Sequence, residues 1–422
     1  MRILLVSDTY APSVNGVAIF TARLAYSLGQ RGHDVHVLVP RWPGQPSSER
    51  QGTHTLHRVP SLPTIVHPYT RACLWYGPVQ AAALLSRLQP DVVHLQTHFS
   101  LGSAVARAAA GLCVPVLGTF HVRPENLLLQ LPLLTALRNA LAKLYWTHLR
   151  SVYRGYTLVT APAASAKAVL ERVGVAAPVR VISNGVDVAR FTPTASAASE
   201  AGAASGPQDE HVRRKYGLPR KKLVLYVGRL DRDKGLDLLG DVIRCVAART
   251  DAHFVICGDG REKDRLSRVL VRSRLEERVS FTGWVPAMYL PSIYRLASLF
   301  VMTGRAETQP LAALEAMASG LPIVALATPG LADVVVNGVT GVLVPPQSSA
   351  ALEAEVRRLW EDAEVRERMA GSARDHAVAA HDFERSVSQF AECYAELCTT
   401  PDRAMAPEQL AGVLPSRRSS GS

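Results

Sequence analysis

Residues 3–39 read ILLVSDTYAPSVNGVAIFTARLAYSLGQRGHDVHVLV, and their pattern decides the fold. A strand-like run from Ile3 to Ser7 is followed by apolar residues at helical spacing from about Val17 to Gln30. A second strand-like run follows from Val35 to Val39. This order of strand, helix and strand predicts two parallel strands with a helix packed against them.

The same alternation continues along the chain and then starts again. Strand-like runs recur at 92–96 and 114–120, and later at 223–227, 254–257, 279–281, 299–302 and 323–325. Between the two groups, TPTASAASEAGAASGP (193–208) has almost no apolar bulk, as expected of a linker or surface insertion. The sequence therefore predicts an α/β protein with two open parallel sheets and a ligand-binding cleft where the carboxyl ends of their strands face each other. The predicted units are residues 1–192, a linker or insertion at 193–215, residues 216–380, a closing helix at 381–398 and a disordered tail at 399–422.

The composition is that of a soluble globular enzyme, because 48% of the 422 residues are hydrophobic and 20% are charged. No uncharged apolar run approaches the ~20 residues that a transmembrane helix needs. The first apolar run meets Asp8 too early for a secretory signal. The six cysteines form no C-x-x-C pair and have no His at ligand spacing. We therefore expect a cytoplasmic protein with reduced cysteines and no zinc site.

The net charge of +11 lies entirely in the first half of the chain. Residues 1–190 contain 18 Lys and Arg against 7 Asp and Glu, whereas the remaining residues contain 29 of each kind. No acid occurs between Glu125 and Glu171. This asymmetry indicates an anionic partner, either nucleic acid or an anionic membrane surface.

Two glutamates mark the strongest candidate for a ligand site. In Glu307-Thr-Gln-Pro-Leu-Ala-Ala-Leu-Glu315, Pro310 fits the first turn of a helix that ends near Gly320. Glu307 then lies at the helix entrance and Glu315 about two turns further on, too far apart to share a proton. They suit two different contacts on one elongated ligand. The alternative is one capping and one solvated glutamate.

A basic turn is the second candidate. Gly228-Arg-Leu-Asp-Arg-Asp-Lys234-Gly235 follows a strand and opens a helix, so Arg229 and Lys234 lie beside helix N–H groups that can bind a pyrophosphate. Taken alone, this segment fits a solvated basic turn equally well. The Asn15-Gly16 loop can also approach a phosphate, but it lacks the G-x-G-x-x-G spacing of dinucleotide-binding enzymes. His121 follows a strand end and is a candidate active-site residue.

In combination, these motifs resemble the retaining glycosyltransferases of family four, which have the GT-B fold of two Rossmann-like domains facing each other across a cleft. The resemblance covers about residues 1–398. It rests on Asn15-Gly16, His121, Asn184-Gly185-Val186-Asp187 with Phe191, Gly228-Arg229, Lys234-Gly235, Gly258-Asp259-Gly260, Phe281-Thr-Gly283, Glu307 to Glu315, and Asn337-Gly338-Val-Thr-Gly341.

The resemblance implies transfer of a hexose from a nucleotide sugar, with no metal and no other cofactor. Arg229 and Lys234 would hold the donor diphosphate from one side and the N–H groups around Gly16 from the other. Glu315 would bind the ribose hydroxyls and Glu307 the hydroxyls of the transferred sugar. The residues that it also implicates are His121 on the sugar or acceptor face and, as further donor contacts, Gly228, Gly258, Gly283, Pro310 and Leu311.

Two positions depart from the family pattern. The family usually has glycine where this chain has Pro310, which cannot offer a backbone N–H to a donor-sugar hydroxyl. Asp333 stands where a glutamate is commoner, so its carboxylate is shorter by one methylene. We expect Asp333 to have only a local role.

Residues 126–154 combine many leucines with Arg138, Lys143, Trp146, Arg150 and Arg154. A helix with a basic face and a Leu/Trp face can lie in a lipid interface. The alternative is a helix that packs on its own sheet and exposes its basic face to solvent. The charge excess of this half favours the membrane, with Trp146 as an apolar anchor.

The segment around His121 and the Glu307-Thr-Gln sequence also resemble bacterial diacylglycerol glucosyltransferases. This resemblance favours a UDP-hexose donor, glucose first, and a membrane lipid acceptor such as diacylglycerol at the inner face of the cell membrane. GDP-mannose as donor and a soluble sugar or sugar phosphate as acceptor stay open. Nucleic-acid binding is disfavoured, because the basic segment has neither an aromatic-interleaved RNA motif nor a helix-turn-helix.

Overall fold

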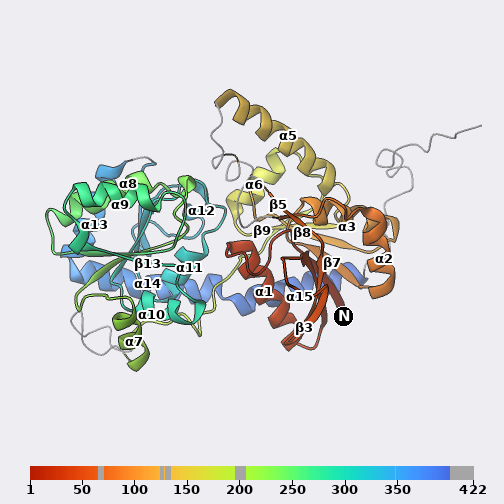
Figure 1. The fold of residues 1–422 in the computed structure, drawn as a ribbon, viewed down its shortest axis with the longest axis horizontal. Helices are drawn as coiled ribbons and strands as arrows, with labels where there is room; N and C mark the ends of the chain where they lie inside the picture. The colour runs from red at the N-terminus through yellow and green to blue at the C-terminus, as the bar shows by residue number, and fades with distance from the viewer. Residues whose placement is uncertain (65–70, 124–127, 129–134, 195–205, 347, 400–422) are drawn as a thin grey trace, which may run out of the picture.

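The computed structural model describes residues 1–64, 71–123, 128, 135–194, 206–346 and 348–399 (Figure 1). Within these residues, the first domain contains an eight-stranded sheet in which only β3 is antiparallel to its neighbour. In spatial order the strands are β10 (Val179–Val181), β9 (Leu158–Ala161), β8 (Val116–Thr119), β7 (Val92–Leu95), β1 (Arg2–Val6), β2 (Asp34–Pro40), β4 (His54–Val59) and β3 (Ser48–Gln51). A separate ribbon pairs β5 (Leu62–Pro63) with β6 (Arg71–Ala72).

Helices cover both faces of this sheet because successive side chains of a strand point to opposite faces. Leu4 and Val6 lie in a core on one face, and Ile3 and Leu5 lie in a second core on the other. The first core is completed by α2 (Pro78–Leu88), α3 (Ser100–Gly111), α5 (Thr135–Tyr153) and α6 (Ala164–Arg172), and the second by α1 (Gly16–Gln30) and α15 (Phe383–Thr399).

The second domain repeats this design on a wholly parallel sheet, which has six strands in the described part of the chain. In spatial order they are β13 (Val279–Gly283), β12 (His253–Cys257), β11 (Leu223–Val227), β14 (Leu299–Met302), β15 (Ile323–Leu326) and β16 (Gly341–Val344). One face packs against α8 (Leu236–Ala247), α9 (Lys263–Arg272) and α13 (Ser349–Glu361). The other packs against α7 (Pro207–Lys215), α10 (Leu290–Arg295), α11 (Leu311–Ala318), α12 (Pro329–Ala332) and α14 (Ala363–His381). Short 3-10 turns lie at Arg232–Lys234, Glu276–Arg278 and Ala287–Tyr289.

The chain crosses between the domains twice, and the two crossings pair with each other. The first crossing follows β10, and Val186 already lies in the core of the second domain. The second joins α14 to α15. Val186 N donates to His381 O at 2.7 Å, and Phe383 N donates to Val186 O at 3.0 Å. Since α15 packs on the first sheet, the last described helix returns to the domain where the chain begins.

The prediction of a linker or insertion at 193–215 is wrong for residues 207–215. Residues 207–215 form α7, whose Val212 lies in the core of the second domain and whose Asp209 carboxylate accepts hydrogen bonds of 2.6 to 3.1 Å from Arg295. Pro207 at the helix start, acids in the first turn and bases in the last are ordinary helix signals that could have identified it. Residues 195–205, and the predicted tail except Thr399, lie outside the described residues.

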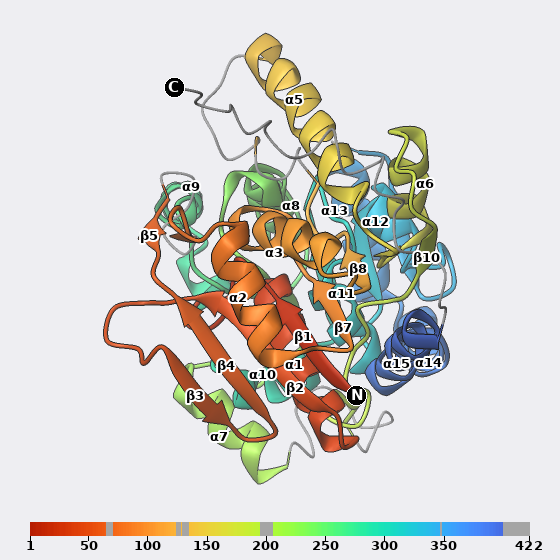
Figure 2. The same cartoon turned by 90° about the vertical axis from the view of Figure 1, so that its right-hand side faces the viewer.

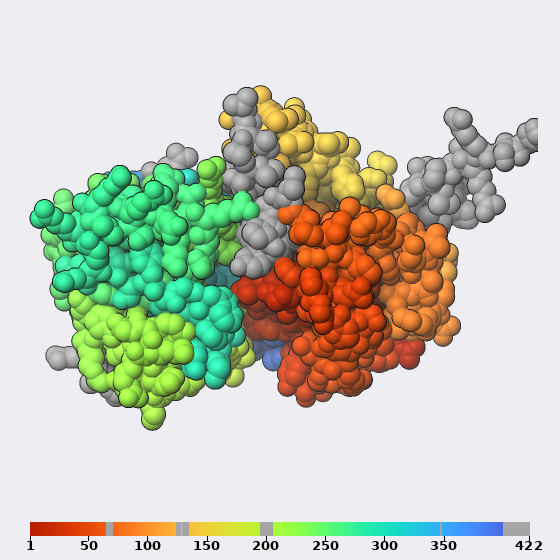
Figure 3. Space-filling model, viewed as in Figure 1, coloured from red at the N-terminus to blue at the C-terminus, as the bar shows by residue number. Residues whose placement is uncertain are grey.

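The two domains form distinct masses that lie side by side (Figure 3). This arrangement is the predicted GT-B fold of two Rossmann-like domains, and the predicted alternation of strands and helices is confirmed in both. Helix α5 projects beyond the rest of the first domain in both ribbon views (Figures 1 and 2). None of the described helices is both long and apolar enough to span a membrane.

Candidate active site

The predicted basic turn and the predicted glutamate meet at the carboxyl end of the second sheet. The turn follows β11, the segment containing Glu307 follows the adjacent strand β14, and the two strands pair in parallel. Gly235 lies at φ 64°, where a side chain would be strained, and a Cβ there would lie 2.2 Å from Thr303 O. The two loops are therefore in backbone contact.

An ion pair joins the two candidates directly. Lys234 Nζ lies 2.7 Å from Glu307 Oε1 and 3.4 Å from Asp233 Oδ2, and the Lys234 side chain is only 16% exposed. Burial alone would lower the pKa of Lys234, but the carboxylates of Glu307 and Asp233 outweigh it and hold the pKa above its ordinary value. The ammonium therefore stays charged at neutral pH.

Two buried aspartates hold the other cation. Arg229 pairs with Asp231 at 2.5 Å and with Asp233 at 3.6 Å, and the two carboxylate side chains are 6% and 2% exposed. The sequence interpretation passed over both residues, although they stand within the quoted turn. Their charges fix Arg229 and Lys234 in place before any anionic ligand arrives, and this preorganisation is what a diphosphate site needs.

Three strand ends lie against one another beside this cluster. Gly228 N donates to Cys257 O at 3.0 Å, and Gly258 N donates to Gly283 O at 2.9 Å. A Cβ on Gly258 would lie 1.9 Å from Gly228 O, so glycine at 258 is required by backbone packing. Contact of Gly228, Gly258 or Gly283 with a donor stays a prediction.

Helix α11 begins immediately after Pro310, which caps it, and Gly320 follows its last turn at φ 71°. Glu307 thus precedes the helix and Glu315 lies within it, as predicted. Burial raises the pKa of Glu315, against the opposing effects of a 2.9 Å hydrogen bond from the Tyr294 hydroxyl and nearby arginines. Glu315 is therefore anchored on one side by Tyr294.

The first domain presents its Gly16 loop to the start of α11. A Cβ added to Gly16 would meet within 4 Å only Leu311 Cδ1, at 3.7 Å. Asn15 caps α1 by accepting a 3.0 Å hydrogen bond from Ala18 N. The predicted contributions of the two domains to one donor site, Gly16 and Leu311, therefore do lie side by side.

His121 lies partly buried just beyond β8, as predicted. Its Nε2 lies 2.9 Å from Gln96 Oε1, and its ring lies 5.0 Å from that of Phe20 on α1. Burial lowers the pKa of His121 to about 3, so the imidazole is neutral at physiological pH. It can exchange hydrogen bonds with a ligand but brings no charge.

Comparison with known proteins places the chain in a family. Residues 14–190 match the family model described as Glycosyltransferase Family 4, and residues 208–376 match that described as Glycosyl transferases group 1. A GDP-mannose-dependent alpha-mannosyltransferase of Mycolicibacterium smegmatis is 32% identical over 367 residues, which cover 85% of this chain and 88% of that protein. The chain belongs to glycosyltransferase family 4.

Two further similarities concern one relative in sequence and one solved structure. An alpha-monoglucosyldiacylglycerol synthase of Streptococcus pneumoniae is 26% identical to this glycosyltransferase over 345 residues, covering 81% of this chain and 75% of that protein. The solved structure of sucrose-phosphate synthase from Thermosynechococcus elongatus superimposes with a TM-score of 0.75 at 22% identity, covering 94% of this chain and 98% of that one. The fold is therefore shared by proteins with different names and substrates.

Gln309, which the sequence interpretation did not single out, connects the glutamate motif to the interdomain crossing. Its Oε1 accepts a 2.7 Å hydrogen bond from Asn184 N, and its Nε2 donates to Ser183 Oγ at 3.1 Å. Ser183 Oγ also lies 3.0 Å from His381 Nδ1 at the second crossing. The loop that carries Glu307 is thus linked to both points where the glycosyltransferase chain changes domain.

Asp333 has more than the local role that was expected. Its Oδ2 accepts a 3.0 Å hydrogen bond from Ser165 N, in the first turn of α6 in the other domain. An anion is stabilised at this end of a helix by its free N–H groups and its dipole. Asp333 therefore bridges the two domains of the glycosyltransferase.

Trp146, the predicted membrane anchor, is partly buried, and its contact with a membrane stays a prediction. It packs against the core of the first domain, with its ring 5.8 Å from that of Phe120. Leu149 and Tyr153 on α5 are fully buried, so this end of the helix packs on its own sheet. The side chains that α5 does expose include Lys143 and Arg150, and Arg154 is exposed directly after the helix ends; these three form no ion pair within the described part of the chain. Leu137 and Leu144 on α5 are 49% and 65% exposed. Arg138 is partly buried, and residues 126–127 and 129–134 lie outside the described residues.

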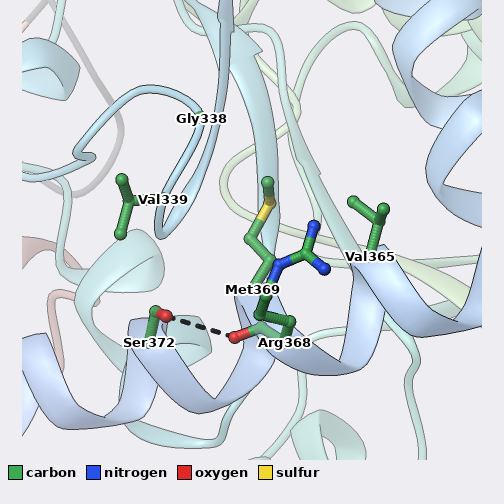
Figure 4. A pocket seen from close by; sticks show the side chains of 6 residues that line it. All are labelled: Gly338, Val339, Val365, Arg368, Met369 and Ser372. Carbon is green, nitrogen blue, oxygen red and sulfur yellow. Dashed lines mark hydrogen bonds between the residues drawn. The ribbon is translucent and has the colours of Figure 1, made fainter.

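The pocket in Figure 4 lies elsewhere, between the Gly338–Val339 turn and α14. The Ser372 hydroxyl there donates to Arg368 O of its own helix at 3.2 Å. None of the predicted donor residues lines this pocket.

Replacing Asp333 by Ala should loosen the contact between the domains. We expect the radius of gyration measured by X-ray scattering to increase, because the hydrogen bond to Ser165 N is lost. The matched control is Asp362→Ala, which removes a 3.0 Å bond of the same kind to Val365 N within one domain. Both variants should lose about 1 kcal/mol of stability. An unchanged radius for Asp333→Ala would contradict the bridging role.

Proposed function

We propose that this glycosyltransferase moves a hexose from a nucleoside diphosphate sugar to a lipid acceptor at an anionic membrane surface, with retention of the anomeric configuration and without a metal. The observation that carries the proposal is the pairing of Lys234 with Glu307 beside Arg229, just before helix α11, whose first residue Leu311 lies against Gly16. Cations and free N–H groups suit a diphosphate, and a carboxylate at the same point suits sugar hydroxyls.

The chemistry follows from where charge develops. Breaking the anomeric bond leaves negative charge on the departing diphosphate and positive charge on the sugar. Arg229 and Lys234, fixed by Asp231 and Asp233, are already in place to stabilise the diphosphate. Glu307 lies beside the Lys234 ammonium. Its carboxylate would therefore be close to a sugar attached to the diphosphate and would accept hydrogen bonds from the sugar hydroxyls. Retention would follow from attack on the face that the diphosphate leaves.

GDP-mannose is the donor that the relatives favour. The M. smegmatis relative is GDP-mannose-dependent, and so are relatives in Mycobacterium tuberculosis and Corynebacterium glutamicum at 29% and 28% identity. UDP-glucose is the second candidate, on the resemblance of the Glu307-Thr-Gln segment to diacylglycerol glucosyltransferases and on the S. pneumoniae relative. Pro310 offers no N–H to the donor sugar with either one.

The lipid acceptor is supported by the charge on the first domain and by the exposed side of α5. Lys143 and Arg150 are seven residues apart on α5, which places them on one stripe of the helix. Arg154 follows the end of the helix, and its N–H donates to Arg150 O at 3.2 Å. Several cations together can hold a protein at an anionic bilayer reversibly. The exposed Leu137 and Leu144 add apolar surface on the same helix.

The proposal is tested by nucleotide release from GDP-mannose, UDP-glucose and UDP-galactose, each with a lipid extract and with soluble sugars as acceptors. Turnover of one donor that rises with the lipid extract supports the proposal. Turnover that rises only with a soluble sugar would replace the lipid acceptor, and turnover with no nucleotide sugar would overturn the function.

Lys234→Ala and Glu307→Gln should each reduce transfer by ~10²-fold or more while the fold survives, since both side chains act at the site and lie outside the apolar cores. The measurement is kcat/KM, with circular dichroism as the folding check. Lys222→Ala, at the amino end of β11, and Glu355→Gln, on α13, are matched controls and should keep full activity. Near-normal turnover of either site variant would contradict the assignment.

Chelation should leave the rate unchanged, because Arg229 and Lys234 supply the positive charge that a metal supplies in other glycosyltransferases. The rate is measured before and after dialysis against EDTA. Loss of turnover that magnesium or manganese restores would show that the two cations do not suffice.

The triple variant of Lys143, Arg150 and Arg154 to Gln should be released from anionic vesicles. Three cations near the surface contribute about 3 kcal/mol, which is more than a hundredfold in partitioning. Sedimentation with vesicles of phosphatidylglycerol and phosphatidylcholine, at low and high salt, measures the effect. The control replaces Arg265, Arg268 and Arg272 of α9 in the second domain by Gln and should bind normally. Equal binding of both variants would contradict a membrane contact through α5.

A further inference from the structure

A continuous chain of hydrogen bonds connects His121 to the C-terminal helix α15. His121 Nε2 lies 2.9 Å from Gln96 Oε1, Gln96 Nε2 lies 3.0 Å from His94 Nε2, and His94 Nδ1 lies 2.7 Å from the Tyr394 hydroxyl. Gln96 is 1% exposed, and His94 and Tyr394 are fully buried. The chain therefore runs through the interior of the first domain from β7 to α15.

The donors and acceptors along this chain fix the proton positions. The amide nitrogen of Gln96 donates to His94 Nε2, which must therefore be the unprotonated nitrogen of that ring and also accepts from the Thr119 hydroxyl at 2.7 Å. His94 then carries its proton on Nδ1 and donates it to the Tyr394 oxygen. At the other end, Gln96 Oε1 can only accept, so the neutral His121 ring must carry its proton on Nε2.

His121 is left with one ring nitrogen for a ligand. With Nε2–H committed to Gln96, Nδ1 is a pure acceptor, and no described residue forms a hydrogen bond with it. Burial lowers the pKa of His121 to about 3, so Nδ1 does not gain a proton at physiological pH. A group that binds there must donate, as a sugar hydroxyl does and a phosphate oxygen does not.

We propose that Gln96, His94 and Tyr394 are positioning residues that hold His121 in the Nε2–H tautomer, so that its Nδ1 accepts a hydrogen bond from a hydroxyl of the donor sugar or the acceptor. The part of this inference that concerns the hydroxyl rests on the proposed function. The part that concerns the tautomer rests only on the hydrogen bonds within the chain.

Burying the polar side chains of Gln96, His94 and Tyr394 costs free energy, and packing alone does not require it. Each buried polar group loses its hydration, and an apolar residue of similar size would fill the same space without that cost. The surroundings are already apolar and aromatic: the His94 ring lies 5.2 Å from that of Phe390, and Phe20 contacts both Phe390 and His121. A polar chain through such a core restricts the orientation of its last member, which is His121.

The test is the tautomer of His121, read from the ring nitrogen shifts of the full-length protein labelled with ¹⁵N-histidine. The His121 signals are assigned by their loss in His121→Ala. In the wild type we expect a protonated Nε2 and a pyridine-like Nδ1. A protonated Nδ1 in the wild type would overturn the proposal.

Three variants test whether the network controls the tautomer. Gln96→Leu removes both hydrogen bonds of the amide and should give a mixture of tautomers. Gln96→Glu keeps an acceptor for Nε2–H of His121 but removes the amide donor to His94 Nε2, so Nε2 of His121 should stay protonated while the tautomer of His94 changes. Tyr394→Phe removes the acceptor for His94 Nδ1–H and should shift the tautomers of both histidines. The matched control is Tyr156→Phe, because the Tyr156 hydroxyl is buried in the same domain and has no hydrogen-bond partner among the described residues. The His121 signals of this variant should not change. Wild-type signals in Gln96→Leu would also overturn the proposal.

Activity supplies a second readout. Gln96→Leu should lower kcat by about 10-fold or more, and leave the affinity for the free nucleoside diphosphate unchanged, because the residue acts on a hydroxyl contact and not on the diphosphate. Unchanged kcat in this variant would refute the role in transfer. The nitrogen shifts do not depend on turnover, so failure of the proposed function and failure of the positioning network give different results.

Discussion

The backbone pairing of Val186 with His381 and Phe383 is the constraint on which the arrangement of the two domains depends. A parallel α/β domain binds ligands at the carboxyl ends of its strands, so two such domains can share one ligand only if those ends face each other. Here the chain passes between the domains twice, and the two passages hold each other through hydrogen bonds of 2.7 and 3.0 Å. Gln309 extends this connection to the loop that carries Glu307.

The candidate site depends on buried charges that neutralise one another. Lys234 is mostly buried, and Glu307 and Asp233, which lie against it, raise its pKa against the opposing effect of burial. Each member of the group therefore depends on the others, and removal of one leaves a buried charge without a partner. A diphosphate that binds here must share the cations with carboxylates that are already present. This arrangement favours a ligand that also offers hydroxyls to Glu307.

The sequence was sufficient for features that depend on local pattern. The pattern of residues 3–39 predicted two parallel strands with a helix packed against them, and the motif at 307–315 predicted which glutamate precedes α11 and which lies within it. The sequence was not sufficient for a side chain that can lie either against lipid or against the protein core. The sequence did not show that Trp146 packs partly against the core of the first domain, because its neighbour Phe120 is distant in the chain.

Contacts between residues distant in the chain were also beyond the sequence. Tyr394 reaches His94 across 300 residues, and Asp333 reaches Ser165 across 168. None of these four residues carries a sequence signal of its partner, because each is an ordinary polar residue on or beside a regular element. Asp231 and Asp233 are a different case, since they stand beside the predicted cations. A count of the charges in that turn would have identified them.

The central claim is that one donor site is built from both domains around Lys234 and Arg229. A crystal structure of the protein with GDP or UDP bound tests it most directly. The account predicts diphosphate oxygens within hydrogen-bond distance of Lys234 and Arg229, the ribose hydroxyls at Glu315, and the Gly16 loop on the opposite side. A diphosphate bound out of reach of both cations would contradict it.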